Sequence, residues 1–153
     1  MVTLINTQSI LNNVQIFLEF ERELPKVLCA KGQLKQVFLN VLKNAIEAMP
    51  MGGNVDVKVQ LKGDDEISIQ IIDQGIGISK ERISTLGETF YTTKEKGTGL
   101  GLMTCFRIIE SHNGILSFHS NENEGTTVEI ILPAVMNKQL TLRSINIVKE
   151  RMP

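Results

Sequence analysis

The sequence contains very little cysteine, and this scarcity excludes two kinds of small-protein architecture. Its two thiols, Cys29 and Cys105, match no metal-binding spacing and are too few for a disulfide framework. We therefore expect two free thiols that serve as small buried packing residues. A chain of this kind fits a reducing, cytoplasmic setting.

The sequence also lacks an excess of charge of either sign. Its 16 basic and 17 acidic residues give a net charge of −1, so the overall charge indicates no nucleic-acid partner and no anionic membrane surface. Its apolar runs are far shorter than the ~20 residues that span a membrane, and residues 1–13 do not resemble a signal peptide. Its 153 residues suit one domain with one core.

Periodicity in the first half of the chain predicts a strand, a helix and a hairpin. Residues 14–21 alternate between apolar and polar, as a half-buried strand does, and residues 33–49 carry apolar side chains at helical spacing. Two further alternating runs, 54–62 and 66–73, flank the turn residues "GDD" and predict a β-hairpin.

The second half is predicted to hold a long irregular segment, a helix and two strands. No clean period is visible from Gln74 to Thr98, a length that usually indicates a functional loop. A helix is expected at about 100–112, with Gly114 as its left-handed cap, followed by strands at 115–120 and 126–133. Hairpins dominate this order, so we expect an α/β fold with a mostly antiparallel sheet and helices on one face.

Two asparagines on the first predicted helix form the first candidate site. Asn40 and Asn44 are one helical turn apart and therefore neighbours. Asparagine is a poor mid-helix residue, costing up to ~0.7 kcal/mol relative to alanine. Its amide oxygen is a suitable ligand for Mg²⁺ that also takes phosphate oxygens. Two solvated polar residues on an outer helix face are the alternative interpretation.

The segment "DQGIG" at 73–77 is the second candidate. Asp73 closes an apolar strand, where a partly buried carboxylate needs a hydrogen-bond donor such as the amine of adenine. The glycines would let the backbone pass close to a flat ring. An ordinary turn, rich in Asp and Gly, is the alternative.

The segment "KEKGTGLGLMT" at 94–104 is the third. It matches neither the dinucleotide fingerprint nor the P-loop pattern. What remains is a glycine-rich entry into a helix, a place where backbone N–H groups and the helix dipole favour an anion. Lys94 and Lys96 add positive charge just upstream. A flexible loop before a helix is the alternative.

Taken together and in this order, the motifs resemble the catalytic ATP-binding domain of bacterial sensor histidine kinases, in the GHKL superfamily with DNA gyrase. The similarity covers about residues 12–133 and includes "QVFLNVLKNAIEAM", "DQGIG", "FYTT", "GTGLGL" and "GTT". It implies a two-layer α/β sandwich of the Bergerat type, a mixed sheet under about three helices. "FYTTKEKGTGLGL" and "LKQVFLNVLKNAIEAMP" resemble nitrogen-regulatory and sporulation kinases in particular.

The resemblance also implies a set of site residues and the cofactors ATP and Mg²⁺. Asn44 would be the metal ligand, Asp73 would accept the adenine amine, and Thr126 would support that contact through a hydroxyl or a water. The catalytic set would be Asn40, Asn44, Lys94 and Lys96. The nucleotide-binding set would be Asn44, Glu47, Asp73, Gly75, Gly77, Ile78, Phe90, Thr92, Thr93, Gly97, Thr98, Gly99, Leu100, Gly101, Leu102 and Thr126.

Asn40 distinguishes between members of the superfamily. Hydrolytic members carry a water-activating Glu at this position, one turn before the metal Asn, and an amide cannot act as that base. The resemblance therefore favours a kinase over an ATP-driven clamp of the gyrase type. The alternative of a stand-alone serine/threonine kinase or anti-sigma-type regulator stays open, although Asn40 counts against it.

The phosphate acceptor expected for a histidine kinase is not among the histidines of this chain. His112 and His119 both have sequence contexts that indicate structural or exposed residues. Residues 1–13 would then be a linker from a dimerisation and phosphoacceptor domain, 14–133 the catalytic domain, and 134–153 a tail of unknown role. The implied partners are that domain, a response regulator reached through it, and inhibitor proteins. The domain would be cytoplasmic, and membrane anchoring of the full-length protein stays open.

Overall fold

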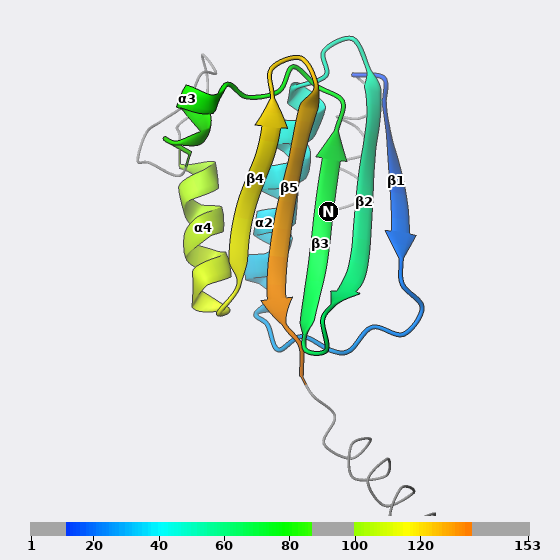
Figure 1. The fold of residues 1–153 in the computed structure, drawn as a ribbon, viewed down its shortest axis with the longest axis vertical. Helices are drawn as coiled ribbons and strands as arrows, with labels where there is room; N and C mark the ends of the chain where they lie inside the picture. Colours follow the sequence, from blue (N-terminus) through cyan, green and yellow to red (C-terminus); the bar gives the residue numbers. More distant parts are fainter. Residues whose placement is uncertain (1–11, 87–99, 136–153) are drawn as a thin grey trace, which may run out of the picture.

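The computed structural model describes residues 12–86 and 100–135, which form a five-stranded sheet with helices on one face (Figure 1). The order of elements confirms the order expected from periodicity. The elements are β1 (Val14–Phe20), α2 (Lys31–Glu47), β2 (Gly53–Lys62), β3 (Glu66–Asp73), α3 (Lys80–Ile83), α4 (Gly101–Ser111), β4 (Ile115–Asn121) and β5 (Gly125–Pro133).

The strands lie in the order β1-β2-β3-β5-β4, and only the β1–β2 pair is parallel. The sheet is therefore mixed and mostly antiparallel, as predicted. The connection from β3 to β5 passes through α3, α4 and β4, yet the two strands are neighbours, and Asp73 at the end of β3 stands opposite Thr126 at the start of β5. The sheet register thus places two residues 53 positions apart side by side.

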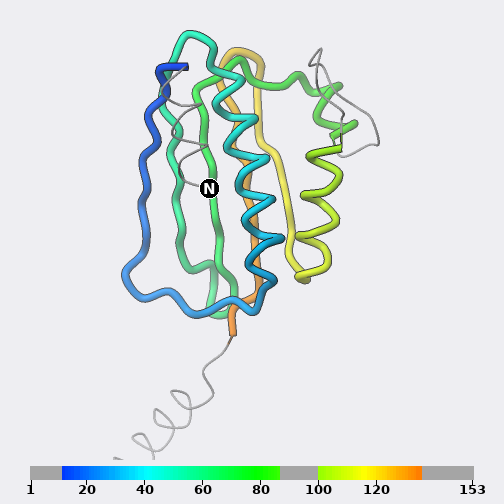
Figure 2. Tube along the Cα trace, turned by 180° about the vertical axis from the view of Figure 1, so that it is seen from behind, coloured from blue at the N-terminus to red at the C-terminus, as the bar shows by residue number. Residues whose placement is uncertain are grey.

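The core lies between the sheet and the two longer helices. Seen from behind in Figure 2, α2 runs across the middle of the sheet and α4 lies beside β4. The apolar stripe of α2 is buried as its spacing predicts, at Leu34, Val37, Val41, Ala45 and Ile46, and Met49, two residues beyond the helix end, is buried as well. It packs on the alternating residues Ile67, Ile69 and Ile71 of β3 and on Val128 and Ile130 of β5. This packing holds α2 in place over the two strands that carry Asp73 and Thr126.

The first strand is less covered than its alternation predicts. Val14 is 6% exposed, but Leu18 and Phe20, on the same side of the strand, are 63% and 60% exposed. Among the described residues, the helices pack over β3 and β4 rather than over β1. The pattern of the strand was therefore correct, but it did not reveal how far the helical layer extends.

The prediction that Gly114 would take the left-handed conformation is wrong. Asn113 has the positive φ, 54°, and the helix ends in a Schellman pattern in which the N–H of Gly114 donates to the carbonyl of Ile109 at 2.9 Å. Gly114 meets a different requirement, because a Cβ there would lie 2.6 Å from the carbonyl oxygen of Ile131. Close approach to β5, rather than backbone conformation, selects this glycine.

The segment after β3 is not irregular throughout, since it contains the short helix α3. Four residues give too short a period to be recognised in the sequence. Among the described residues, no helix is long and apolar enough to cross a membrane. The predicted linker and tail fall largely outside the described ranges, so the domain boundaries stay predictions.

Candidate functional site

Asp73 is the buried charge around which the site is built. It ends β3 and is 6% exposed. One of its carboxylate oxygens, Oδ1, accepts hydrogen bonds from the backbone N–H groups of Gly75 at 2.8 Å and Thr126 at 3.2 Å. Among the described residues, none donates to the other oxygen, Oδ2. The protein therefore holds the carboxylate in place with one oxygen and leaves the second for a donor from outside.

Burial governs the ionisation of this carboxyl. Removal from water raises the pKa of Asp73, and the two backbone donors, which stabilise the charged form, offset only part of that effect. A carboxylate that is costly to ionise is a strong acceptor for any donor that reaches it. Asp73 is therefore suited to bind an amino group in a site with little water.

The glycines of "DQGIG" are required by the protein's own packing. A Cβ on Gly75 would lie 2.7 Å from the Cβ of Ala48 at the end of α2. Gly77 has φ of 69°, and a Cβ there would overlap the carbonyl of Asn121. The sequence argument explained these glycines by a passing ring, whereas the structure gives a reason that needs no ligand. Their place beside Asp73 agrees with the prediction.

The loop after Asp73 is fixed at both sides. The N–H of Ile76 donates to the carbonyl of Ala48 at 3.1 Å, and the carbonyl of Ile76 accepts from the N–H of Asn123 at 2.7 Å. The first contact connects the loop to α2, and the second connects it to the β4–β5 hairpin. The loop that carries Gly75 and Gly77 is therefore held between the helix with the two asparagines and the strand with Thr126.

A hydroxyl pair lies next to Asp73. The Thr126 side chain is 8% exposed, and its Oγ1 lies 2.9 Å from the Oγ of Ser120 on β4. Ser120 Oγ also donates to the carbonyl of Gly125 at 2.7 Å and accepts from the N–H of Ile78 at 2.8 Å. Ser120 was not among the predicted site residues. Its position at the end of a strand, in line with the inward-facing Leu116 and Phe118, could have indicated it.

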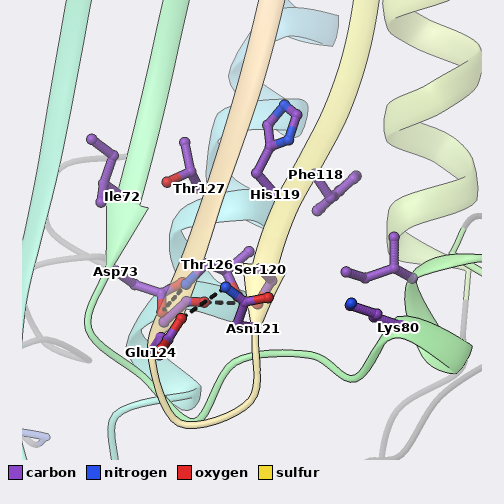
Figure 3. Close-up of a pocket in the computed structure, with 12 residues that line it drawn as sticks. Ile72, Asp73, Lys80, Phe118, His119, Ser120, Asn121, Glu124, Thr126 and Thr127 are labelled. Carbon is purple, nitrogen blue, oxygen red and sulfur yellow. Dashed lines mark hydrogen bonds between the residues drawn. The ribbon is translucent and has the colours of Figure 1, made fainter.

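Asp73, Ser120 and Thr126 line a cavity of about 470 Å³ (Figure 3). Small-molecule sites occupy roughly 300–1,000 Å³, so a purine and part of a sugar would fit. The close-up shows Asp73, Ser120 and Thr126 grouped at one side and Lys80 of α3 at the other. The lining comprises Ile72, Asp73, Lys80, Ile83, Phe118, His119, Ser120, Asn121, Glu124, Gly125, Thr126 and Thr127. Lys80, Ile83 and Phe118 were missed by the sequence argument.

Asn40 lies on the side of α2 that faces α4 rather than on an outer surface. Asn40 Nδ2 donates to the carbonyl of Gly101 at 3.5 Å and approaches the Sγ of Cys105 at 3.7 Å. Asn44 and Glu47 follow one turn later, both partly buried, and Glu47 pairs with Lys43 at 3.8 Å. The interpretation as two solvated residues is therefore not supported for Asn40, which connects α2 to the first residue of α4.

The structure thus brings the predicted residues together in two groups, joined by α2. One group contains Asp73, Gly75, Gly77, Ile78 and Thr126. In the other, Asn40 contacts Gly101 at the start of α4, next to Leu100 and Leu102 in the chain, while Asn44 and Glu47 lie farther along α2. A third set lies outside the described residues, so its placement stays a prediction: Phe90, Thr92, Thr93, Lys94, Lys96, Gly97, Thr98 and Gly99.

A magnesium ion would find few protein ligands here. Among the described residues there is no cluster of three or more His, Cys, Asp or Glu side chains that could hold a metal. Asn44 supplies a neutral amide oxygen, which suits Mg²⁺ that arrives with most of its ligands as water and phosphate oxygens. The donor set therefore fits a metal bound together with a nucleotide, and it does not fit a resident metal.

Comparisons with known proteins agree with this geometry. Residues 30–136 match the family model of histidine kinase-, DNA gyrase B- and HSP90-like ATPases. Sporulation kinase E of Bacillus subtilis (strain 168) is 46% identical over 138 residues, which cover 90% of this chain and 19% of the relative. Sporulation kinase A of the same organism is 42% identical over 130 residues, covering 85% and 21%. The chain thus spans about a fifth of the length of these relatives.

A solved structure shows the same fold. The mycobacterial sensor histidine kinase MprB superposes with a TM-score of 0.75 at 26% sequence identity, over 87% of this chain and 90% of that one. The mixed sheet with helices on one face is therefore the arrangement found in histidine kinases.

Proposed function

The chain belongs to the family of histidine kinase-, DNA gyrase B- and HSP90-like ATPases, and we propose that it is the catalytic ATP-binding domain of a two-component sensor histidine kinase. In this proposal it binds Mg-ATP and transfers the γ-phosphoryl group to a histidine on a separate dimerisation domain. The observation that carries the proposal is Asp73, a buried carboxylate with one oxygen held by backbone donors and the other left for the adenine amine.

Base recognition would take place in the cavity beside Asp73. The Oδ2 of Asp73 accepts the 6-amino group, and the apolar side chains of Ile83 and Phe118 cover the ring. Gly75 and Gly77 keep the loop against α2 and β4, so that the carboxylate does not move when the base binds. A site of this kind selects adenine because guanine would present an oxygen to the carboxylate.

The phosphates would lie toward Asn44 and the start of α4. Asn44 would hold a Mg²⁺ ion together with phosphate oxygens, and the ion neutralises charge on those oxygens when it is bound. Asn40 donates to the carbonyl of Gly101 and so fixes the first turn of α4 against α2. Lys94 and Lys96 would approach the same phosphates from the segment between the two described ranges.

The transfer needs no base from this chain. The unprotonated ring nitrogen of a neutral acceptor histidine forms the new P–N bond while the bond between the γ-phosphorus and the bridging oxygen breaks and ADP leaves, and the proton on the other ring nitrogen is then lost to solvent. Asn40 cannot deprotonate a water molecule, so the γ-phosphate is kept for the histidine rather than hydrolysed. Neither His112 nor His119 is a suitable acceptor, since both ring nitrogens of His112 are engaged by backbone groups and His119 lies within β4.

The partners follow from this role. The acceptor would be the dimerisation domain of the same full-length protein, a response regulator would take the phosphoryl group from it, and inhibitor proteins would act on the kinase. The site of action would be the cytoplasm, where ATP is available. The sequence resemblance to sporulation kinases agrees with the relatives found, but the signal and the regulator belong to parts of the pathway beyond this domain.

One experiment distinguishes the proposal from its alternatives. The chain is incubated with ATP labelled on the γ-phosphate, with the dimerisation domain of its full-length protein and without it. We expect acid-labile, base-stable label on that domain and little free phosphate. Acid-stable label on a serine would favour the stand-alone kinase, and rapid release of phosphate by the chain alone would favour a hydrolytic clamp. Absence of label from a chain that binds ATP would contradict the histidine kinase assignment.

A further inference from the structure

Ser120 on β4 connects this strand to β5 and to the loop that leads into α3, beside the cavity that contains Asp73. It lies next to the end of β4, and its hydroxyl oxygen contacts the carbonyl of Gly125, the hydroxyl of Thr126 and the N–H of Ile78. The first two belong to β5, and the third belongs to the loop that leads into α3. The family resemblance assigned no role to this residue.

The number of protons available to these groups determines the direction of each hydrogen bond. A serine hydroxyl has one proton to donate, and a carbonyl oxygen can only accept. The Oγ of Ser120 lies 2.7 Å from the carbonyl of Gly125, so its proton is used there. The contact of 2.9 Å with Thr126 Oγ1 then requires the threonine to donate. The N–H of Ile78 fills the other acceptor position of Ser120 at 2.8 Å.

It follows that the Thr126 hydroxyl has no proton left for a ligand. Thr126 lines the cavity beside Asp73, with which it is paired in the sheet register. The Oδ2 of Asp73 is also an acceptor when the carboxyl is ionised. Two residues that are paired in the sheet and line the same cavity therefore each present an oxygen that can only accept, and the two hydrogens of one amino group could satisfy both of them.

We propose that Ser120 is a specificity-determining positioning residue, which orients the Thr126 hydroxyl so that the cavity accepts a purine with a 6-amino group and rejects one with a 6-oxo group. The inference rests on the proposed function, because it assumes that this cavity holds the base of ATP. In this inference the Thr126 hydroxyl oxygen discriminates between bases together with the Asp73 carboxylate, and Ser120 acts by setting the direction in which the Thr126 hydroxyl donates.

The test compares two nucleotides that differ at the position concerned. Inosine triphosphate has an oxygen where ATP has the amino group. Replacement of Ser120 by alanine releases the Thr126 proton, which can then turn toward that oxygen. We expect the ratio of the inosine triphosphate Kd to the ATP Kd to fall about tenfold in Ser120→Ala, the factor that corresponds to one neutral hydrogen bond. Ser120→Thr, which keeps the hydroxyl, should retain the wild-type ratio.

Two further variants separate this effect from general loosening of the site. Ser117→Ala removes a hydroxyl from the same strand, where it makes no hydrogen bond among the described residues, and it should leave the ratio unchanged. In a Thr126→Val background there is no hydroxyl to orient, so adding Ser120→Ala should not change the ratio further. A general loss of structure would weaken the binding of ATP and of inosine triphosphate alike and would leave the ratio of their Kd values unchanged.

The possible results are distinct. A wild-type ratio in Ser120→Ala, or an equal fall in the Thr126→Val background, would overturn the inference while leaving the proposed function intact. Failure of the wild-type chain to bind ATP would overturn both. If Ser120→Ala does not fold, Ser120→Cys takes its place, because sulfur is a weaker acceptor for the Thr126 proton. A smaller fall in the ratio is then expected, and no fall would overturn the inference.

Discussion

Replacement of Asp73 by asparagine should separate nucleotide binding from stability. The amide keeps the shape of the side chain. Its Oδ1 can still accept from the N–H groups of Gly75 and Thr126, which lie 2.8 and 3.2 Å from the Oδ1 of Asp73 in the structure. Its Nδ2, however, replaces the oxygen that would accept the adenine amine, so that two donors face one another. The variant therefore changes the ligand-facing atom and leaves the protein-facing atom as it was.

The magnitude follows from the bond that is lost. A hydrogen bond to a charged group contributes about 1.5–3 kcal/mol, which corresponds to a loss of affinity of roughly 10–150-fold. We expect Asp73→Asn to weaken ATP binding by at least the lower factor in a calorimetric titration. Asp56→Asn is a matched control, since Asp56 lies on β2 and is not among the residues that line the cavity. The control should bind ATP as the wild type does.

The same variant should not destabilise the empty domain at neutral pH. Burial raises the pKa of Asp73 in the folded state, so its contribution to the free energy of unfolding is fully present below its ordinary pKa. That contribution is lost as the pH rises through the raised value. The asparagine does not titrate, so its stability relative to the wild type should increase across that window, as measured by thermal unfolding. An affinity for ATP within twofold of the wild type, or a lower Tm at neutral pH, would refute this reasoning.

Three further outcomes are expected from the structure. Gly77→Ala should lower the free energy of unfolding by more than about 1 kcal/mol, because its φ of 69° and its contact with a carbonyl leave no room for a Cβ. Gly32→Ala, in α2 with no atom within 4 Å of the added Cβ, should raise the free energy of unfolding by up to about 1 kcal/mol. If chemical denaturation gives the same change for both glycine variants, close packing around Gly77 is not the cause. Glu129 loses charge only at low pH, because hydrogen bonds from Ser68 and Lys62 outweigh its burial and lower its pKa. Its contribution to stability should be present above the ordinary glutamate pKa and lost as the pH falls through the lowered value, whereas Glu129→Gln should not show that loss in thermal unfolding. Asn40→Asp places an acceptor against the carbonyl of Gly101 and should lower Tm and phosphoryl transfer together; unchanged values would remove the proposed connection between α2 and α4.

Much of the fold could be predicted because its patterns are local. The stripe of α2 and the alternation of β2 and β3 each follow from residues close together in the chain, and both were confirmed. The pairing of β3 with β5 could not be predicted from the spacing of residues. It depends on the path that the chain takes through α3, α4 and β4 between the two strands. The exposure of Leu18 and Phe20 likewise depends on where the helices lie rather than on the strand itself.

Candidate site residues could be predicted where they belong to a sequence motif. Residues that join the site only through the folding of distant segments could not. Asp73 and Asn44 were proposed as site residues from residue type, context and the resemblance, and the structure pairs Asp73 with Thr126 in the sheet. Ser120 and Lys80 were missed, because a serine or a lysine acquires meaning only from its neighbours in space. The sequence argument explained Gly75 and Gly77 by a passing base, whereas in the structure their glycine requirement comes from Ala48 and the β4–β5 hairpin.

The most direct test of the central claim is a crystal structure of this chain with a non-hydrolysable ATP analogue and Mg²⁺. The account predicts the adenine amine within hydrogen-bonding distance of Asp73 Oδ2, the metal on the amide oxygen of Asn44, and the phosphates at the start of α4. A nucleotide bound elsewhere, or a base that leaves Asp73 without a donor, would contradict it.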